Sequence, residues 1–215
     1  AGLPDWQELL SSLARRDEVC LSDEEVAELQ SLTMPDQAAV IAARLARTGG
    51  DALQGRLLQE LVVAQVGAGE YSITHGLLAG MRLQAVVTTN YDTLFEAACA
   101  GAQLQVNKLP YEAAKAEHFV LKLHGDVDHP EDIVLTRSQM SDHREQNKAL
   151  SGIVQSMLIT KHLLFVGFSL QDPLFTELAG TVRTALRTTR TPTRKAGGDG
   201  GGGGGGDGGG GGGGG

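Results

Sequence analysis

Cysteine is scarce in this sequence, which excludes the kinds of site that are built from it. The 215 residues include only two cysteines, Cys20 and Cys99. Two isolated thiols are too few for a disulfide framework or a zinc site, so we expect neither. Long apolar runs are missing as well, since no stretch reaches the roughly eighteen residues that a membrane-spanning helix needs. Without a visible signal peptide, we expect a soluble protein of the cytoplasm that has no membrane partner.

Basic residues are fewer than acidic ones, with 18 Lys and Arg against 26 Asp and Glu. The formal net charge is −8 at pH 7, which does not support a nonspecific grip on the phosphates of nucleic acids. A basic cluster near the end of the chain is more typical of the solvated face of a final helix than of a nucleic-acid-binding patch. We therefore expect no direct contact with nucleic acid. The cluster consists of Arg183, Arg187, Arg190, Arg194 and Lys195.

The last part of the chain has almost no side chains. From Gly197 to Gly215 only two aspartates interrupt the glycines. Such a segment cannot bury apolar surface to offset the entropy that it loses on ordering, so it cannot build a core. We therefore expect no fold over residues 196–215 and one substantial domain over residues 1–195.

The sequence before residue 84 carries helical patterns. Trp6, Leu9 and Leu13 recur at the spacing of one helix face, and Ser22 followed by Glu25 is a capping-box signature. We therefore predict a helical segment over about residues 5–81. Its helices are expected to begin near Trp6 and Ser22 and to cover residues 37–47, 51–66 and 74–81.

From residue 84 onward, apolar runs of strand length alternate with helical patterns. This alternation is typical of a parallel sheet that helices cover on both faces. We therefore predict an α/β fold, with a Rossmann-like parallel sheet over about residues 84–188 and the helical segment as an N-terminal insertion. The predicted strands are 84–88, 104–107, 118–123, 132–136 and 162–166, and the predicted helices are 93–100, 138–160 and 172–188.

Three of the predicted strands run directly into polar residues. In open α/β folds ligands bind outside the carboxyl ends of the strands, so these ends form our site hypothesis. An amide can hold a hydroxyl or a water, a carboxylate can orient a ribose, and backbone N–H groups at a strand-to-helix turn can take a phosphate oxygen. The residues at the three ends are Asn90 and Asp92, then His124, and finally Gly167, Phe168 and Ser169.

These polar residues also have plainer interpretations. Asn90 or Asp92 could simply cap the following helix, and Asp92 is the stronger candidate for that role. His124 could be a core histidine bonded to a carbonyl. The glycine that follows it, Gly125, permits tight backbone approach, and this setting favours general base work near neutral pH.

Other features are predicted to be structural. Asp172 before Pro173 is the start signal of the last helix. His129 and His143 are predicted to lie at the surface. The sequence has neither a GxGxxG turn nor a Walker lysine loop, and no serine or cysteine stands on a nucleophile elbow, so a hydrolase triad is unsupported.

Four motifs of this chain, taken together, resemble those of sirtuins. Residues 1–6 are similar to the sirtuin segment "SGIPDF", residues 88–92 to "TQNID", residues 123–125 to "LHG" and residues 167–170 to "GTSL". They occur in the same order. The forms "TTNYD", "KLHGD" and "GFSxxDP" resemble the bacterial sirtuin-like branch more closely.

The resemblance implies a sirtuin-like NAD-binding domain over residues 1–195 and assigns roles within it. His124 would be the base, and Asn90 would hold the nicotinamide ribose or a water. Asp92 would lie near the nicotinamide, and the last motif would contact the adenosine ribose and the phosphates. The residues implied in binding NAD are Asp5, Trp6, Thr89, Asp92, Gly167, Phe168 and Ser169.

The chain departs from the sirtuin pattern in two ways. The first strand of the family and its "GAGxS" phosphate loop would precede Ala1, and this sequence does not contain them. Protein-deacylating sirtuins also carry paired CxxC motifs between "LHG" and "GTSL", whereas no cysteine lies between His124 and Gly167 here. We therefore expect no zinc ribbon and no bound metal, and the acyl-lysine cleft would be much reduced.

Zinc-less bacterial relatives are known as NAD-cleaving effectors of anti-phage defence, so the resemblance implies an NAD+ glycohydrolase. A water placed by Asn90 and deprotonated by His124 would cleave NAD+ to nicotinamide and ADP-ribose. The alternatives are a non-catalytic module that binds NAD or ADP-ribose, and an NAD-dependent protein deacylase. Because depletion of a shared cofactor must be held in check, we expect activity to depend on a homo-oligomer, on a partner ATPase or on an Argonaute-like sensor.

Overall fold

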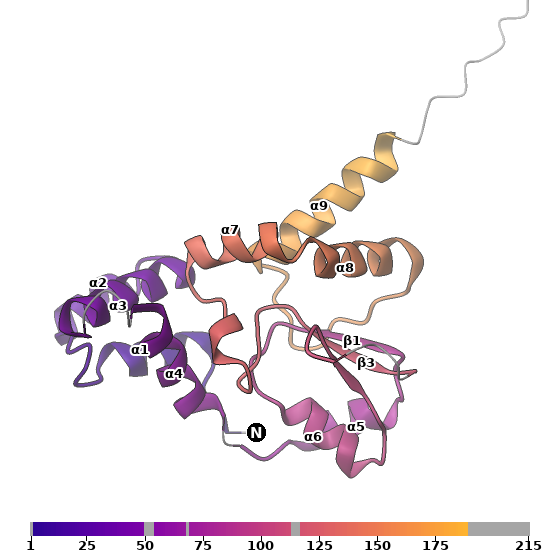
Figure 1. Cartoon of the computed structure of the whole chain (residues 1–215), viewed down its shortest axis with the longest axis horizontal. Coiled ribbons are helices and arrows are strands. Elements are labelled where there is room, and N and C mark those ends of the chain that lie inside the picture. Colours follow the sequence, from indigo (N-terminus) through magenta and orange to yellow (C-terminus); the bar gives the residue numbers. More distant parts are fainter. Residues whose placement is uncertain (1, 50–53, 68, 113–116, 189–215) are drawn as a thin grey trace, which may run out of the picture.

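The structure is a computed structural model that describes residues 2–49, 54–67, 69–112 and 117–188. The tail predicted to have no fold lies outside these residues, as does the start of the helix predicted over 51–66. Figure 1 shows a group of helices from the first part of the chain beside a small sheet that lies between further helices. None of the helices in the described part is long and apolar enough to cross a membrane.

The first part of the chain is helical, as predicted, and local capping signals start its helices. Ser22 Oγ accepts a hydrogen bond of 3.2 Å from the Glu25 N–H, and the Glu25 carboxylate accepts one of 2.9 Å from the Ser22 N–H. This reciprocal pair is the predicted capping box. The helices of this part are α1 (Trp6–Ala14), α2 (Asp23–Leu29), α3 (Met34–Gly49), α4 (Gln54–Val66) and α5 (Ile73–Gly80).

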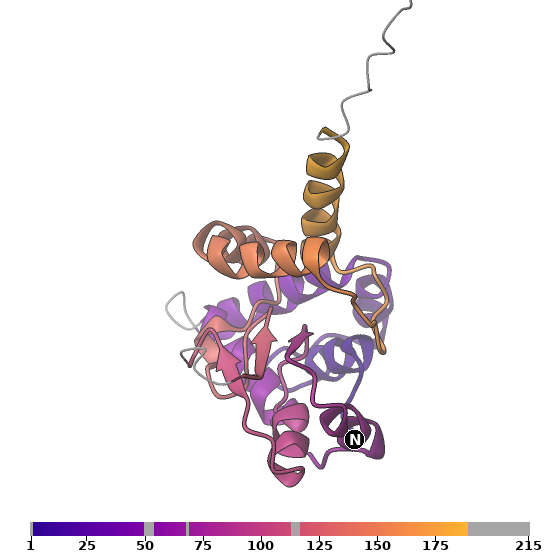
Figure 2. The same cartoon turned by 90° about the vertical axis from the view of Figure 1, so that its right-hand side faces the viewer.

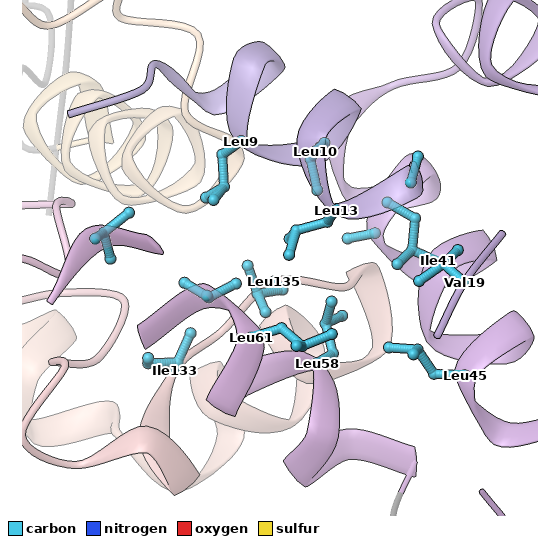
Figure 3. Close-up of a cluster of buried hydrophobic side chains, with 14 of the residues drawn as sticks. Leu9, Leu10, Leu13, Val19, Ile41, Leu45, Leu58, Leu61, Ile133 and Leu135 are labelled. Atoms are coloured by element: carbon cyan, nitrogen blue, oxygen red, sulfur yellow. The ribbon is translucent and has the colours of Figure 1, made fainter. Parts of the chain in front are cut away.

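One hydrophobic core joins helices α1–α4 to the segment that follows His124. Leu10, Leu13 and Ile41 are fully buried in this core, and so is Leu135 from the later segment. Figure 3 shows Ile133 and Leu135 beside the side chains of α4. The helical part therefore shares its packing with the residues around His124 rather than forming a separate unit.

The second part contains the predicted parallel sheet. Its strands are β1 (Ala85–Thr88), β2 (Asn107–Leu109) and β3 (Phe119–Lys122), in the order β1-β3-β2 with both pairings parallel. The α/β class and the Rossmann-like parallel sheet are thus confirmed. The helices of this part are α6 (Leu94–Gly101), η2 (Pro130–Asp132, a 3₁₀ helix), α7 (Arg137–Gln146), α8 (Lys148–Thr160) and α9 (Pro173–Thr188).

Helices lie on both sides of the sheet, as Figures 1 and 2 show. On one side, α8 and α9 bury Leu150 and Leu174 in a cluster with Leu121 and Leu123 of the central strand and its end. On the other side, α5 and α6 pack on each other around the buried thiol of Cys99. This layering leaves the carboxyl ends of the strands as the edge where polar groups collect.

The strand predicted over 132–136 is wrong. η2 occupies its start, and the residues after it are buried without joining the sheet. Their backbone groups bond elsewhere: the Val134 N–H donates to the His124 carbonyl at 2.9 Å, and the Ile133 carbonyl accepts from the Gln59 side chain at 2.7 Å. The apolar pattern indicated burial correctly, but burial alone does not make a strand.

The strand predicted over 162–166 is also wrong. Leu164, Phe165 and Val166 are exposed, and no strand of the described part pairs with them. A strand requires a neighbouring strand to satisfy its N–H and C=O groups. The segment has a strand-like sequence without such a neighbour.

Two other predicted elements differ from the structure in their bounds or number. The weak strand predicted over 104–107 is β2, which begins at Asn107, because Leu104 instead closes α6 through its N–H to the Cys99 carbonyl at 2.9 Å. The helix predicted over 138–160 is two helices, α7 and α8. They are separated at Asn147, whose ψ of 41° is not helical.

Candidate active site

Two parallel neighbouring strands deliver the first two polar groups to the same edge of the sheet. Thr88 at the end of β1 pairs with Lys122 at the end of β3, and the Leu123 N–H donates to the Thr88 carbonyl at 2.9 Å. Asn90 and His124 each follow two residues after these ends. The Asn90 N–H donates to Thr88 Oγ1 at 3.1 Å, and the residue is exposed. The amide is therefore open to a ligand at this edge.

His124 is buried, with 4% of its surface exposed, and bonds to a carboxylate from a distant segment. Its Nε2 lies 2.6 Å from Asp172 Oδ2. Its Nδ1 is buried and has no hydrogen-bond partner among the residues that the structure describes. With the proton on Nε2 donated to Asp172, Nδ1 carries a lone pair and can accept a proton. The role of His124 as the base stays a prediction.

Asp172 does more than the sequence indicated. As predicted it starts α9, since its Oδ1 accepts from the Phe175 N–H at 2.8 Å, but its other oxygen also holds His124. Burial would raise the pKa of Asp172, but the hydrogen bond from the His124 imidazole, aided by backbone N–H groups, brings the pKa below its usual value. Asp172 is thus a carboxylate that fixes the orientation of the histidine.

The Asp172→Asn variant is expected to be less stable than the parent by about 1–2 kcal/mol near neutral pH, because a charge-assisted hydrogen bond becomes a neutral one. A carboxyl whose folded pKa is lowered stabilises the fold above its unfolded pKa, and this stabilisation is lost as the pH falls through the folded pKa. The difference between parent and variant should therefore shrink below about pH 4. Urea unfolding from pH 7 to pH 3 measures it, and a difference that stays constant over this range would contradict the assignment.

Tyr91, between Asn90 and Asp92, anchors this turn in the core of the helical part. Its hydroxyl donates to the Val134 carbonyl at 2.8 Å, and burial raises its pKa, so it stays a neutral donor. The ring of Trp6 lies 5.7 Å from the ring of Tyr91, centroid to centroid. Trp6 is therefore next to the turn that carries Asn90. The sequence interpretation assigned no role to Tyr91.

Asp5 and Asp92, both predicted to bind NAD, each accept a hydrogen bond from a backbone N–H in the first turn of a helix, and Asp5 is the N-cap of α1. Asp5 Oδ1 accepts from the Glu8 N–H at 2.8 Å, and Asp92 Oδ1 accepts from the Leu94 N–H at 3.0 Å. Asp92 thus bonds the first N–H of α6, but the N-cap residue of that helix is Thr93. Binding roles for both residues stay predictions, as does the role of Thr89, which is half-buried.

The third motif forms the loop before α9. Gly167 has a φ of +64°, a conformation that glycine adopts without strain. The Phe168 ring packs edge-on against Phe175, with 5.1 Å between centroids, and Ser169 Oγ accepts from the Gln171 N–H at 3.3 Å. Because this loop leads into Asp172, the Asp172–His124 bond connects it to the same edge as Asn90.

His143 corrects the sequence interpretation. It was predicted to lie at the surface, but it is half-buried in α7. Burial lowers the pKa of His143. No local signal distinguished it, because its neighbours in sequence are polar.

No group of three or more His, Cys, Asp or Glu side chains among the described residues could hold a metal ion. Cys20 is exposed and Cys99 is buried in the α5–α6 cluster, so the two thiols occupy different surroundings.

Comparison with known proteins gives related matches. A family model described as "SIR2-like domain" matches residues 84–195, more than half of the chain. The chain is 36% identical over 121 residues to the NAD(+) hydrolase ThsA of Bacillus cereus (strain MSX-D12), which covers 52% of this chain and 25% of that protein. It is 29% identical over 189 residues to the NAD(+) hydrolase ThsA of Acinetobacter baumannii (strain 532279), covering 85% of this chain and 36% of that protein.

A relative with another name also matches. The chain is 28% identical over 116 residues to "Defense-associated sirtuin 2" of Bacillus subtilis, covering 51% of this chain and 12% of that protein. This chain thus spans about a third or less of the length of these relatives. The matched stretch includes both strand ends that carry Asn90 and His124.

Proposed function

This chain belongs to the SIR2-like domain family, and from that premise we propose that it is an NAD+ glycohydrolase that acts in anti-phage defence by depleting NAD+. The observation that carries the proposal is the buried His124–Asp172 pair. Its Nδ1, which has no hydrogen-bond partner among the described residues, belongs to the strand edge that also presents Asn90. The names of the ThsA and defence-associated relatives support the substrate and the setting.

The reaction breaks the bond between the nicotinamide nitrogen and the ribose. Nicotinamide leaves with the electron pair of that bond and becomes neutral, so no acid has to protonate it. Positive charge develops on the ribose as the bond breaks, and a water then forms the new C–O bond. His124 Nδ1 takes the proton of this water while Asp172 holds the Nε2–H, and the Asn90 amide holds the water or a ribose hydroxyl. The products are nicotinamide and ADP-ribose.

The other assignments belong to the same proposal. Trp6 and Asp5 would line the nicotinamide side, next to the turn that carries Thr89 and Asp92. The loop of Gly167, Phe168 and Ser169 would contact the adenosine ribose and the phosphates. NAD+ is the substrate and no zinc is required. We further propose that the protein works in the cytoplasm and that a homo-oligomer, a partner ATPase or an Argonaute-like sensor controls it.

The test is release of nicotinamide and ADP-ribose from NAD+ in equal amounts, measured by chromatography. Asn90→Ala is expected to lower turnover by about a hundredfold, because the water or ribose loses its positioning amide. The matched control is Asn147→Ala, since Asn147 lies between α7 and α8 and makes no side-chain capping bond. This control should keep the parent rate.

The two alternatives give different results in the same assay. A binding module would bind NAD+ in calorimetry without releasing nicotinamide. A deacylase would release nicotinamide only when an acyl-lysine peptide is present. Either result would overturn the hydrolase assignment.

A further inference from the structure

Lys122 is a charged residue in the interior of the molecule. It ends the central strand β3, and its side chain is 0% exposed. A buried ammonium is costly unless carboxylates and hydrogen-bond acceptors surround it. An apolar residue at this position would avoid that cost. The groups that the Lys122 ammonium contacts therefore indicate its role.

The ammonium of Lys122 contacts the two loops that form the proposed site. It donates to the carbonyls of Tyr91 (at 3.4 Å) and Asp92, the two residues directly after Asn90. It also pairs with Asp126 Oδ2 at 3.0 Å, two residues after His124. A single group thus bonds to the backbone of the Asn90 turn and to a side chain of the His124 loop.

Further charged residues form ion pairs around this ammonium and its partner Asp126. Glu96 of α6 lies 3.3 Å from Lys122 Nζ, and Lys108 of β2 pairs with Asp126 Oδ1 at 2.9 Å and with Asp128 at 2.6 Å. Burial would raise the pKa of Asp126, but its bonds to the two lysines lower it, so the carboxylate stays charged. Two lysines thus face two largely buried carboxylates, Asp126 and Glu96, and a third, Asp128, that is exposed, so the buried charges have opposite partners.

A second, uncharged contact joins the same two loops. The Val127 N–H donates to the Tyr91 carbonyl at 3.0 Å, which is the carbonyl that Lys122 also contacts. This bond can hold the loops together when the ammonium is removed. Loss of Lys122 should therefore shift the Asn90 amide without unfolding the sheet.

We propose that Lys122 is a positioning residue for the NAD+ hydrolase reaction, because its ammonium fixes the position of the Asn90 turn relative to the His124 loop. This inference rests on the proposed function. Lys122 does not touch the reacting atoms; it acts through Asn90, and an error of about 1 Å in such a group can cost about a hundredfold in rate.

The test uses Lys122→Met combined with Glu96→Gln, which removes the charge without leaving the Glu96 carboxylate unpaired. We expect kcat for nicotinamide release to fall about ten- to a hundredfold while the KM for NAD+ changes by less than about threefold. Lys122→Arg keeps the charge and should recover most of the rate. Lys148→Met is the matched control, because Lys148 is 73% exposed and lies on α8.

A double-mutant cycle with Asn90→Ala separates positioning from general weakening of the fold. If Lys122 acts through Asn90, adding the Lys122 change to Asn90→Ala should cause little further loss, whereas independent effects would multiply. Multiplying effects, or an unchanged kcat in a folded charge-free variant, would overturn the proposal. Failure of the parent protein to release nicotinamide would instead overturn the proposed function, so the two failures are distinguishable.

Discussion

His124→Ala is expected to lower kcat for nicotinamide release by about 10²–10⁴-fold, the usual contribution of a general base. In the proposed mechanism, the substitution removes the Nδ1 lone pair that would take the proton of the attacking water. It also leaves the Asp172 carboxylate without its histidine partner, although Asp172 still caps α9. Turnover is measured from initial rates of nicotinamide release at saturating NAD+.

The matched control for this variant is His162→Ala, because His162 is an exposed histidine in the segment before α9. It should keep the parent rate. Thermal unfolding of both variants checks that the fold survives. A folded His124→Ala protein whose rate stays within a few-fold of the parent would remove His124 from the mechanism.

The Gly125→Ala variant should lose about 3–5 kcal/mol of unfolding free energy, the largest stability effect that we expect from a single methyl group here. Gly125 has a φ of +96°, which residues with a Cβ rarely adopt. An added Cβ would lie 2.6 Å from the carbonyl carbon of Asp132 and 2.7 Å from the Ile133 Cα. Both are backbone atoms, so no side chain can move aside.

Urea unfolding at pH 7 measures this loss. Gly152→Ala is the matched control, since Gly152 lies in α8 and an added Cβ there meets nothing within 4 Å. That control should be neutral or stabilise the protein by up to about 1 kcal/mol, as glycine is unfavourable within helices. If Gly125→Ala loses less than about 1 kcal/mol of unfolding free energy, the backbone of the His124 loop can move to accommodate the added methyl group. That result would contradict the tight packing of this loop.

Features that depend on neighbouring residues were predictable from the sequence. The Ser22–Glu25 capping box and the cap at Asp172 join residues three positions apart, and both are present. The ends of β1 and β3 were also found, because a buried β-branched run followed by polar residues is a local pattern. This was sufficient to place Asn90 and His124 at one edge of the sheet.

Features that depend on distant partners were not predictable in the same way. The bond between His124 and Asp172 joins residues 48 positions apart, so the sequence showed the helix cap and not its second partner. Lys122 lies in an apolar run whose pattern indicates only burial. The segment 162–166 has the composition of a strand, yet strand formation is decided by a neighbour that a local pattern cannot supply.

The shared core of the helical part has a consequence for how the protein responds to a bound ligand. Tyr91 and Leu135, which flank the site, are buried among the leucines of α1 and α4. Loosening these helices would remove the support of the Asn90 turn, so the two parts should melt in one cooperative transition. By mass action, a molecule that binds only the native site then stabilises α1 and α4 as well. By the same linkage, a protein that binds α1 or α4 would change the affinity of the site for its ligand.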